Sequence, residues 1–281
     1  MLPLLDPTAQ LVIGHRGASA LAPENTLAGF RRALAEGADA LELDVHVTAD
    51  GVPVVIHDPT LERTTDRVGA VAESTLERLR EADAGARFTP DGGRTYPWRG
   101  KGERVPTLAE VIEALPDTPI LIELKDPRAQ LAVRGVLLER GAVDRCVVAS
   151  NDHRALAAFH QPPFLRGASR RDITRLWLAS KLGAAWGAKD CLLYAVPPRH
   201  RGLEVTTDSF LAAARCLGRP VHVWTVDDPA LATLLWERGA SGIITNAPGT
   251  MVRPKEAARA RSAGAGREGR VAAGHFAARA G

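Results

Sequence analysis

Short apolar runs alternate along the chain with longer segments in which apolar residues recur every three or four positions. Short runs of this kind, bounded by turn-forming residues, are typical of strands buried on both faces, and the longer periodicity is typical of amphipathic helices. Strands are therefore expected at 11–15, 40–45, 120–125, 146–150, 164–169, 191–196, 221–226 and 242–245. Helices are expected at 25–37, 128–140, 152–159, 171–182, 208–217 and 229–237.

Strands separated by helix-length segments indicate βαβ units and a parallel sheet, so the fold class is α/β. Eight parallel strands fit a (β/α)₈ TIM barrel, expected to fill residues 1–250 as one domain. A doubly wound sheet can also hold eight strands, so the strand count alone leaves both architectures open. Residues 58–105 are too long for a simple loop, and we expect a small insertion that caps the barrel mouth.

Residues 40–58 predict a β-hairpin that extends the second strand. Asp50-Gly51 is a strong signal for a two-residue turn between antiparallel arms. With that turn, the numbers of paired residues add to 101, and Asp44 faces His57. The second strand would then extend past the mouth of the barrel, and the returning arm of the hairpin would place His57 beside Asp44. A register shifted by one residue would still leave His57 near the mouth.

Three carboxylates are predicted to meet at this mouth. Glu42 and Asp44 alternate on one face of a strand that is otherwise apolar, about 7 Å apart along it. Glu123 and Lys125 repeat the pattern on the next strand. Buried carboxylates need a cation or hydrogen bonds, and ordinary ion pairs are the alternative explanation. Three oxygen ligands suit a hard divalent cation, Mg²⁺ or Ca²⁺, better than zinc.

Two histidines flank the carboxylates, His15 at the end of the first strand and His57 on the hairpin. Barrel enzymes hold their active sites at the carboxyl ends of the strands. Because histidine titrates near neutrality, such a pair can deprotonate a nucleophile and protonate a leaving oxygen. Arg16 and Lys125 offer positive charge to a phosphoryl group.

The remaining histidines are expected to be ordinary surface or core residues. His222 begins a strand at the end opposite the mouth, and His46 lies about 13 Å along the strand from Glu42. The others, His153, His160, His200 and His275, fall in loops, helices or the chain end.

The charge of the 281-residue chain is uneven. Residues 252–281 carry a formal charge of +5, which leaves −2 on the rest of a chain whose total is +3. We expect residues 251–281 to form a basic, disordered tail outside the folded body. Nucleic-acid binding is not expected, because only Phe276 offers an aromatic ring among the arginines.

The three cysteines are far apart, so neither a disulfide framework nor a Cys metal site is indicated. The amino terminus lacks a signal-peptide pattern, and no apolar run reaches the roughly 20 residues of a membrane span. These features favour a cytoplasmic protein.

The chain resembles the glycerophosphodiester phosphodiesterase family over roughly residues 12–248. The resemblance depends on separated motifs in a fixed order: HRG, PENT, ELDV and HDPTLERTT, followed by IELK, VWTVDDP and GIITNAP. It implies a barrel that cleaves glycerophosphodiesters to an alcohol and glycerol 3-phosphate.

The resemblance also implies roles for individual residues. Glu42, Asp44 and Glu123 match the metal ligands, and His15 and His57 match the general acid/base pair. Arg16 and Lys125 match phosphate-binding positions, and Trp224 matches an aromatic residue that lines the substrate pocket. Glu24 and Asn25, from PENT, would support the first loop near the metal.

Two residues depart from the family pattern. Asn246 stands where many members carry an acidic residue, and Asp227 stands where the family usually has Asn. Both are expected at the mouth, where they would alter the alcohol pocket without touching the proposed chemistry.

Other functions remain open at this point. A related barrel phosphodiesterase acting on lysophospholipids or sphingomyelin-like lipids would keep the same cluster. A barrel isomerase or aldolase would share the acids and the lysine, but it would not need both histidines. A non-catalytic phosphodiester-binding protein would bind without turnover. The alcohol, the metal, the role of each histidine and the oligomeric state are not determined by the sequence.

Overall fold

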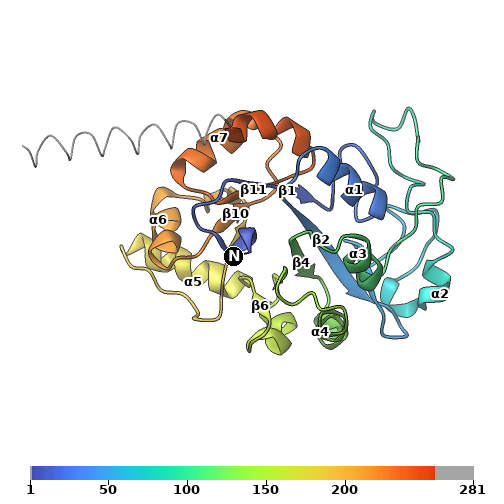
Figure 1. The fold of residues 1–281 in the computed structure, drawn as a ribbon, viewed down its shortest axis with the longest axis horizontal. Helices are drawn as coiled ribbons and strands as arrows, with labels where there is room; N and C mark the ends of the chain where they lie inside the picture. The colour runs from blue at the N-terminus through green and yellow to red at the C-terminus, as the bar shows by residue number, and fades with distance from the viewer. Residues whose placement is uncertain (1, 257–281) are drawn as a thin grey trace, which may run out of the picture.

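A computed structural model describes residues 2–256 of the chain (Figure 1). Its main sheet contains eight parallel strands in the order β6-β5-β4-β2-β1-β11-β10-β7. The strands are β1 (Leu11–His15), β2 (Ala40–Val47), β4 (Ile120–Leu124), β5 (Cys146–Ala149), β6 (Leu165–Arg166), β7 (Tyr194–Val196), β10 (Val221–Val223) and β11 (Gly242–Thr245). Each of the eight overlaps one of the strands that the apolar runs predict, although β6, β7 and β10 are shorter than predicted.

The two outer strands of this order, β6 and β7, meet and close the sheet. Arg166 and Cys191 form a parallel bridge. The Leu192 amide donates to the Arg166 carbonyl at 2.8 Å, and the Ala168 amide donates to the Leu193 carbonyl at 2.9 Å. The sheet therefore returns on itself as a (β/α)₈ barrel, as the sequence predicts, and an open doubly wound sheet is excluded.

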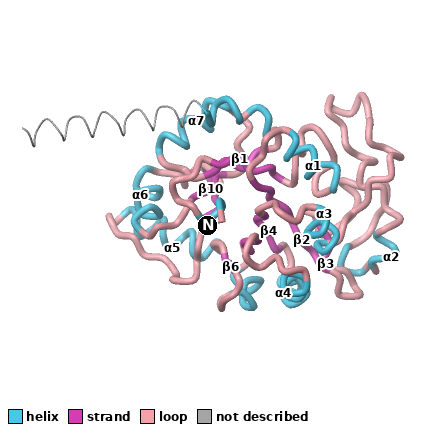
Figure 2. Tube along the Cα trace, in the orientation of Figure 1, coloured by secondary structure: helices cyan, strands magenta, loops and turns pink. Residues whose placement is uncertain are grey.

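Helices surround the strands, as Figure 2 shows. They are α1 (Leu27–Ala35), α3 (Leu108–Ala114), α4 (Gln130–Glu139) preceded by η3 (Pro127–Ala129), η4 (His153–Phe159), α5 (Arg170–Lys181), α6 (Asp208–Cys216) and α7 (Pro229–Arg238). The predicted helices are confirmed, with 153–159 formed as a 3₁₀ helix. Helix α3 was not predicted, although Thr107 and Glu110 form a capping box that marks its start.

The alternation of side chains along the strands separates an apolar barrel floor from a polar mouth. Leu11 and Ile13 on β1, Ala40 on β2 and Leu121 on β4 belong to the apolar cluster that fills the lower interior. Below it, Leu4 of η1 (Pro3–Leu5) is fully buried. Two residues further along each strand, the same interior phase brings polar side chains to the carboxyl ends. These are His15, Glu42, Asp44 and Glu123.

The hairpin of β2 and β3 (Pro53–Val55) is present, but its predicted register is wrong by one residue. Val45 pairs with Val55 and Val47 with Pro53, so that paired numbers add to 100. The Gly51 amide donates to the Thr48 carbonyl, and Gly51 has a left-handed φ of 81°. The turn is therefore a three-residue loop with a glycine bulge rather than the expected two-residue turn.

Residues 58–105 pack beside this hairpin around a small apolar cluster of their own (Figure 1). They contain η2 (Val71–Glu73) and α2 (Leu76–Leu79), and Leu61, Val71 and Leu79 pack against Val54 and Ile56. The segment thus has enough buried apolar surface to hold a fixed position against the barrel.

A second hairpin, β8 (Arg199–His200) and β9 (Leu203–Glu204), follows β7. Beyond η5 (Pro248–Thr250), Met251 is buried and the Lys255 ammonium lies 2.9 Å from an Asp39 oxygen. The rest of the predicted tail, 257–281, lies outside the described residues. Within residues 2–256, no helix combines the length and the apolar character that crossing a bilayer requires.

Candidate active site

The residues predicted for the site converge on one pocket of about 210 Å³ at the carboxyl ends of the strands. All eight parallel strands or the residues directly after them contribute to its lining. Its polar members include His15, Arg16, Glu42, His57, Glu123, Lys125, Ser150 and Asn151. Its apolar members are Leu121, Ala149, Ala168, Ile173, Ala195, Trp224 and Ile244. Asp44 is the one predicted site residue outside this lining, and it is 1% exposed.

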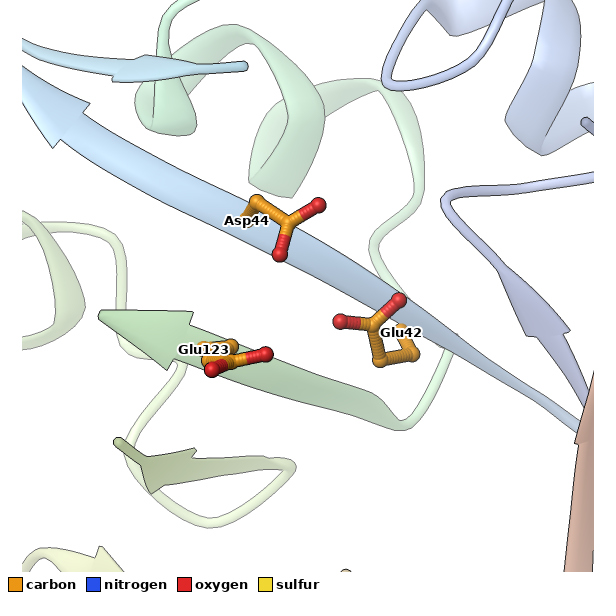
Figure 3. A group of neighbouring side chains, drawn as sticks. All are labelled: Glu42, Asp44 and Glu123. Atoms are coloured by element: carbon orange, nitrogen blue, oxygen red, sulfur yellow. The ribbon is translucent and has the colours of Figure 1, made fainter. Parts of the chain in front are cut away.

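Glu42, Asp44 and Glu123 form a compact carboxylate cluster (Figure 3). Asp44 of β2 is in register with Glu123 of β4, and one ligand oxygen from each of the three lies within 4.8 Å of the others. Burial and the charges of Asp44 and Glu123 raise the pKa of Glu42 well above its usual value. Without a cation, the site therefore disfavours a third negative charge on Glu42, as expected for a carboxylate that can bind a divalent cation.

Two cations lie against this cluster. The Arg16 Nε is 3.0 Å from one Asp44 oxygen, and the Lys125 Nζ is 3.0 Å from the other and 2.8 Å from Glu123. Burial alone would raise the pKa of Asp44, but Lys125 and Arg16 outweigh it and the pKa lies below its usual value. The alternative of ion pairing is thus realised for Asp44 and Glu123. Glu42 has no Lys or Arg side chain within 4 Å among residues 2–256, so ion pairing does not account for it.

The loop that follows β1 holds Asp44 in place through hydrogen bonds. The Asn25 side chain donates to Asp44 at 3.0 Å, and the Asp44 amide donates back to Asn25 at 3.3 Å. Asn25 and Arg16 both adopt left-handed backbone conformations, with φ of 55° and 53°. Such conformations are unfavourable for side-chain-bearing residues and concentrate at functional sites. Glu24 holds the Arg16 guanidinium at 2.9 Å, in agreement with the support expected from PENT.

His57 lies between two side chains that the sequence analysis did not select. Its Nδ1 is 2.5 Å from Asp58 Oδ1, and its backbone carbonyl lies 3.0 Å from the Nε2 of His46. Arg63 binds Asp58 and also Glu24, which links the insertion to the first loop. Although burial opposes it, Arg63 and His57 lower the pKa of Asp58 to about 2, so this carboxylate is ionised at neutral pH.

His15 has a different partner. Its Nδ1 is 2.7 Å from the side-chain oxygen of Asn246, whose amide donates to Asp227 at 2.6 Å. The prediction that Asn246 stays clear of the proposed chemistry is therefore wrong, whereas Asp227 contacts Asn246 and Thr245 but not His15. Burial and the neighbouring Arg16 charge lower the pKa of His15 below its usual value, so the ring is neutral at pH 7.

Asn151 is a further residue that the sequence analysis missed. Its side chain donates to Glu123 at 2.9 Å and lines the pocket. Its position directly after a predicted strand was the available signal, since strand ends face the mouth of a barrel. The same signal applied to Asn246, which follows β11.

The amino-acid sequence is similar to those of known proteins. The profile of the Glycerophosphoryl diester phosphodiesterase family matches residues 15–250. A glycerophosphodiester phosphodiesterase from Caldanaerobacter subterraneus is 32% identical over 86% of this chain and 96% of its own length. One from Bacillus subtilis is 30% identical over 87% of this chain and 86% of its own length.

Solved structures agree. A phosphodiesterase from Oleispira antarctica in complex with the product sn-glycerol-3-phosphate superposes with a TM-score of 0.70 at 26% identity, covering 88% of this chain and 96% of that one. A putative glycerophosphoryl diester phosphodiesterase from Silicibacter pomeroyi gives 0.71 at 28% identity, covering 91% and 97%. The chain therefore belongs to the glycerophosphoryl diester phosphodiesterase family.

Proposed function

We propose that this protein hydrolyses glycerophosphodiesters to an alcohol and sn-glycerol 3-phosphate, with a divalent cation and a histidine pair. The observation that carries the proposal is the meeting of His15, His57 and three carboxylates around one pocket in a member of this family. The product-bound relative from Oleispira antarctica supports the choice of glycerol 3-phosphate as one product.

Glu42, Asp44 and Glu123 would hold the cation. Their oxygen donors, their mutual proximity and the raised pKa of Glu42 fit Mg²⁺ or Ca²⁺, both of which prefer carboxylate oxygens. When bound, the ion supplies positive charge that neutralises the phosphoryl oxygens as negative charge develops on them. Asn25 and Asn151 would orient two of the ligands through the hydrogen bonds described above.

Arg16 and Lys125 would hold the substrate's phosphate. Both line the pocket, and both carry several N–H donors that suit phosphate oxygens. Each also contacts Asp44, so the residues that hold the phosphate are tied to those that hold the cation. Trp224 and the other apolar lining residues would pack against the alcohol group of the substrate and shield its apolar part from water.

The partners of the two histidines favour separate roles. His57 faces the ionised Asp58, which stabilises an imidazolium, so His57 would protonate the departing alkoxide. His15 would then accept the proton of the attacking oxygen, which comes from water or from the substrate's own glycerol hydroxyl. With water as the nucleophile, a P–O bond forms to the water oxygen, the P–O bond to the alcohol breaks, and each histidine exchanges one proton, which gives glycerol 3-phosphate directly. With the glycerol hydroxyl as the nucleophile, the same exchange gives a cyclic phosphodiester, and water must then open the ring, with the two histidines exchanging roles, to give glycerol 3-phosphate.

A coupled assay for glycerol 3-phosphate tests the proposal. Glycerophosphocholine, glycerophosphoethanolamine and glycerophosphoinositol are each supplied with EDTA, and then with excess Mg²⁺ or Ca²⁺. We expect release that EDTA abolishes and a divalent cation restores. H153Q serves as a control because His153 is exposed and outside the pocket lining. Absence of release from all three, together with cleavage of lysophosphatidylcholine, would overturn the substrate assignment in favour of a lipid phosphodiesterase.

A further inference from the structure

Asp227 lies outside the pocket lining and is connected to His15 through a single residue, Asn246, which hydrogen-bonds to both. We propose that Asp227 is a positioning residue that acts through Asn246: it fixes the proton of His15 on Nδ1 and leaves the Nε2 lone pair facing the pocket. The catalytic consequence rests on the proposed function of His15, whereas the position of the proton does not.

The orientation of the Asn246 amide follows from its partners. An ionised carboxylate only accepts hydrogen bonds, so the group that faces Asp227 Oδ2 at 2.6 Å must be the NH₂ of Asn246. The amide oxygen is thereby turned toward His15 Nδ1 at 2.7 Å. The Ser19 hydroxyl donates to the same oxygen at 2.6 Å, which satisfies its second lone pair.

Asp227 is itself held in place. Its other oxygen accepts from the Asn246 backbone amide and from the Thr245 hydroxyl, both at 2.8 Å. The Asp227 carboxylate thus accepts hydrogen bonds from both the backbone amide and the side-chain amide of Asn246. An asparagine without this partner could present either end of its amide to the histidine, because the two ends have nearly the same shape.

The tautomer of His15 follows from the amide. Since an amide oxygen cannot donate, Nδ1 of His15 must carry the proton, and the neutral ring then has its lone pair on Nε2. Nε2 lies 4.0 Å from Glu42, on the pocket side of the ring. This is the tautomer that can accept a proton from a nucleophile in the pocket.

D227N separates this role from a structural one. The substitution keeps the size of the side chain and an oxygen for Thr245 and the Asn246 backbone, but it places an NH₂ opposite the NH₂ of Asn246. The amide of Asn246 is then expected to flip and turn its donors toward His15. We expect kcat to fall about tenfold, with KM and melting temperature close to those of the wild type.

The exchange D227N/N246D is the rescue variant. The carboxylate introduced at position 246 again offers an acceptor to His15, and the amide introduced at position 227 again donates to its neighbour. The kcat should therefore return to within about threefold of the wild type. D228N is the matched control. Asp228 is adjacent in sequence and caps α7 by accepting from the Ala230 amide, but it makes no hydrogen bond to Asn246 or His15.

Long-range ¹H–¹⁵N NMR at pH 8 reads the tautomer directly in protein labelled with ¹⁵N-histidine, with the His15 signals assigned by their loss in H15Q. Wild type and the exchange variant should show a proton on Nδ1, and D227N should show it on Nε2. A wild-type ring protonated on Nε2 would overturn the proposal, and so would a folded D227N with unchanged tautomer and kcat, or an exchange variant that folds without rescue. Because the spectrum needs no substrate, it decides the question even if the proposed hydrolysis fails.

Discussion

His222 should make the barrel sensitive to mild acid. It is the second residue of β10 on the barrel floor, is fully buried, and its Nε2 lies 2.9 Å from the Leu4 carbonyl. Burial lowers the pKa of His222 to about 4, although the hydrogen bond to Leu4 opposes the shift. The folded protein therefore keeps this ring neutral at a pH where an unfolded chain would protonate it.

The size of the effect follows from linkage. An unfolded histidine titrates near pH 6.5, so between pH 6.5 and 4 the unfolded state binds a proton that the folded state does not. Above pH 6.5 the ring is neutral in both states, and its titration does not lower the free energy of unfolding. As the pH falls from 6.5 toward 4, protonation of the unfolded state progressively lowers that free energy. At about 1.4 kcal/mol per pH unit, the loss in the free energy of unfolding is about 3 kcal/mol.

Urea denaturation at several pH values between 7.5 and 4 measures this loss. H222Q removes the titrating ring and keeps an amide that can donate to Leu4, and H153Q is the control for loss of an exposed histidine. Wild type and H153Q should lose about 3 kcal/mol more than H222Q over this range. Curves for wild type and H222Q that stay parallel to within about 1 kcal/mol would refute the assignment of acid sensitivity to this ring.

Three further predictions concern the mouth and the seam of the barrel. D44N should lower kcat/KM at least about 100-fold and abolish Mg²⁺ or Ca²⁺ binding in calorimetry, with circular dichroism unchanged; retained binding would remove Asp44 from the ligand set. H57Q should lower kcat by about 10² to 10⁴-fold with KM nearly constant, and unchanged kcat would refute its acid role. R166M should destabilise the fold by about 3–5 kcal/mol in urea, because Arg166 of β6 is buried and pairs with Asp172 of α5 and with Asp190 ahead of β7; a cost below 1 kcal/mol would contradict that reasoning.

The barrel could be predicted because its strands are buried on both faces and therefore read as uninterrupted apolar runs. The predictions were least complete where other forces shape the chain. Segment 164–169 contributes only the two residues of β6 to the sheet, and α3 was hidden behind the long insertion. The hairpin register differs by one residue because Gly51 takes a left-handed conformation and lengthens the turn.

The carboxylate cluster could be anticipated for a different reason. Strand alternation fixes which side chains share a face, and parallel neighbours β2 and β4 bring Asp44 and Glu123 side by side. Contacts made by loops do not follow from such periodicity. The link from Asp58 through Arg63 to Glu24 joins the insertion to the first loop, and its geometry depends on how 45 or so irregular residues fold.

The error over Asn246 shows how barrel closure itself carries information about the site. His15 and Asn246 are separated by 231 positions, and the sequence alone suggested no contact. Closure makes β1 and β11 neighbours, with Gly14 in register with Thr245, so the residues that follow each of them must lie side by side at the mouth. Once eight parallel strands are assigned, the partner of a histidine at the end of the first strand should therefore be sought directly after the last. A neutral amide there orients the ring without adding charge beside the carboxylate cluster, while Asp227 keeps the carboxylate one residue further away.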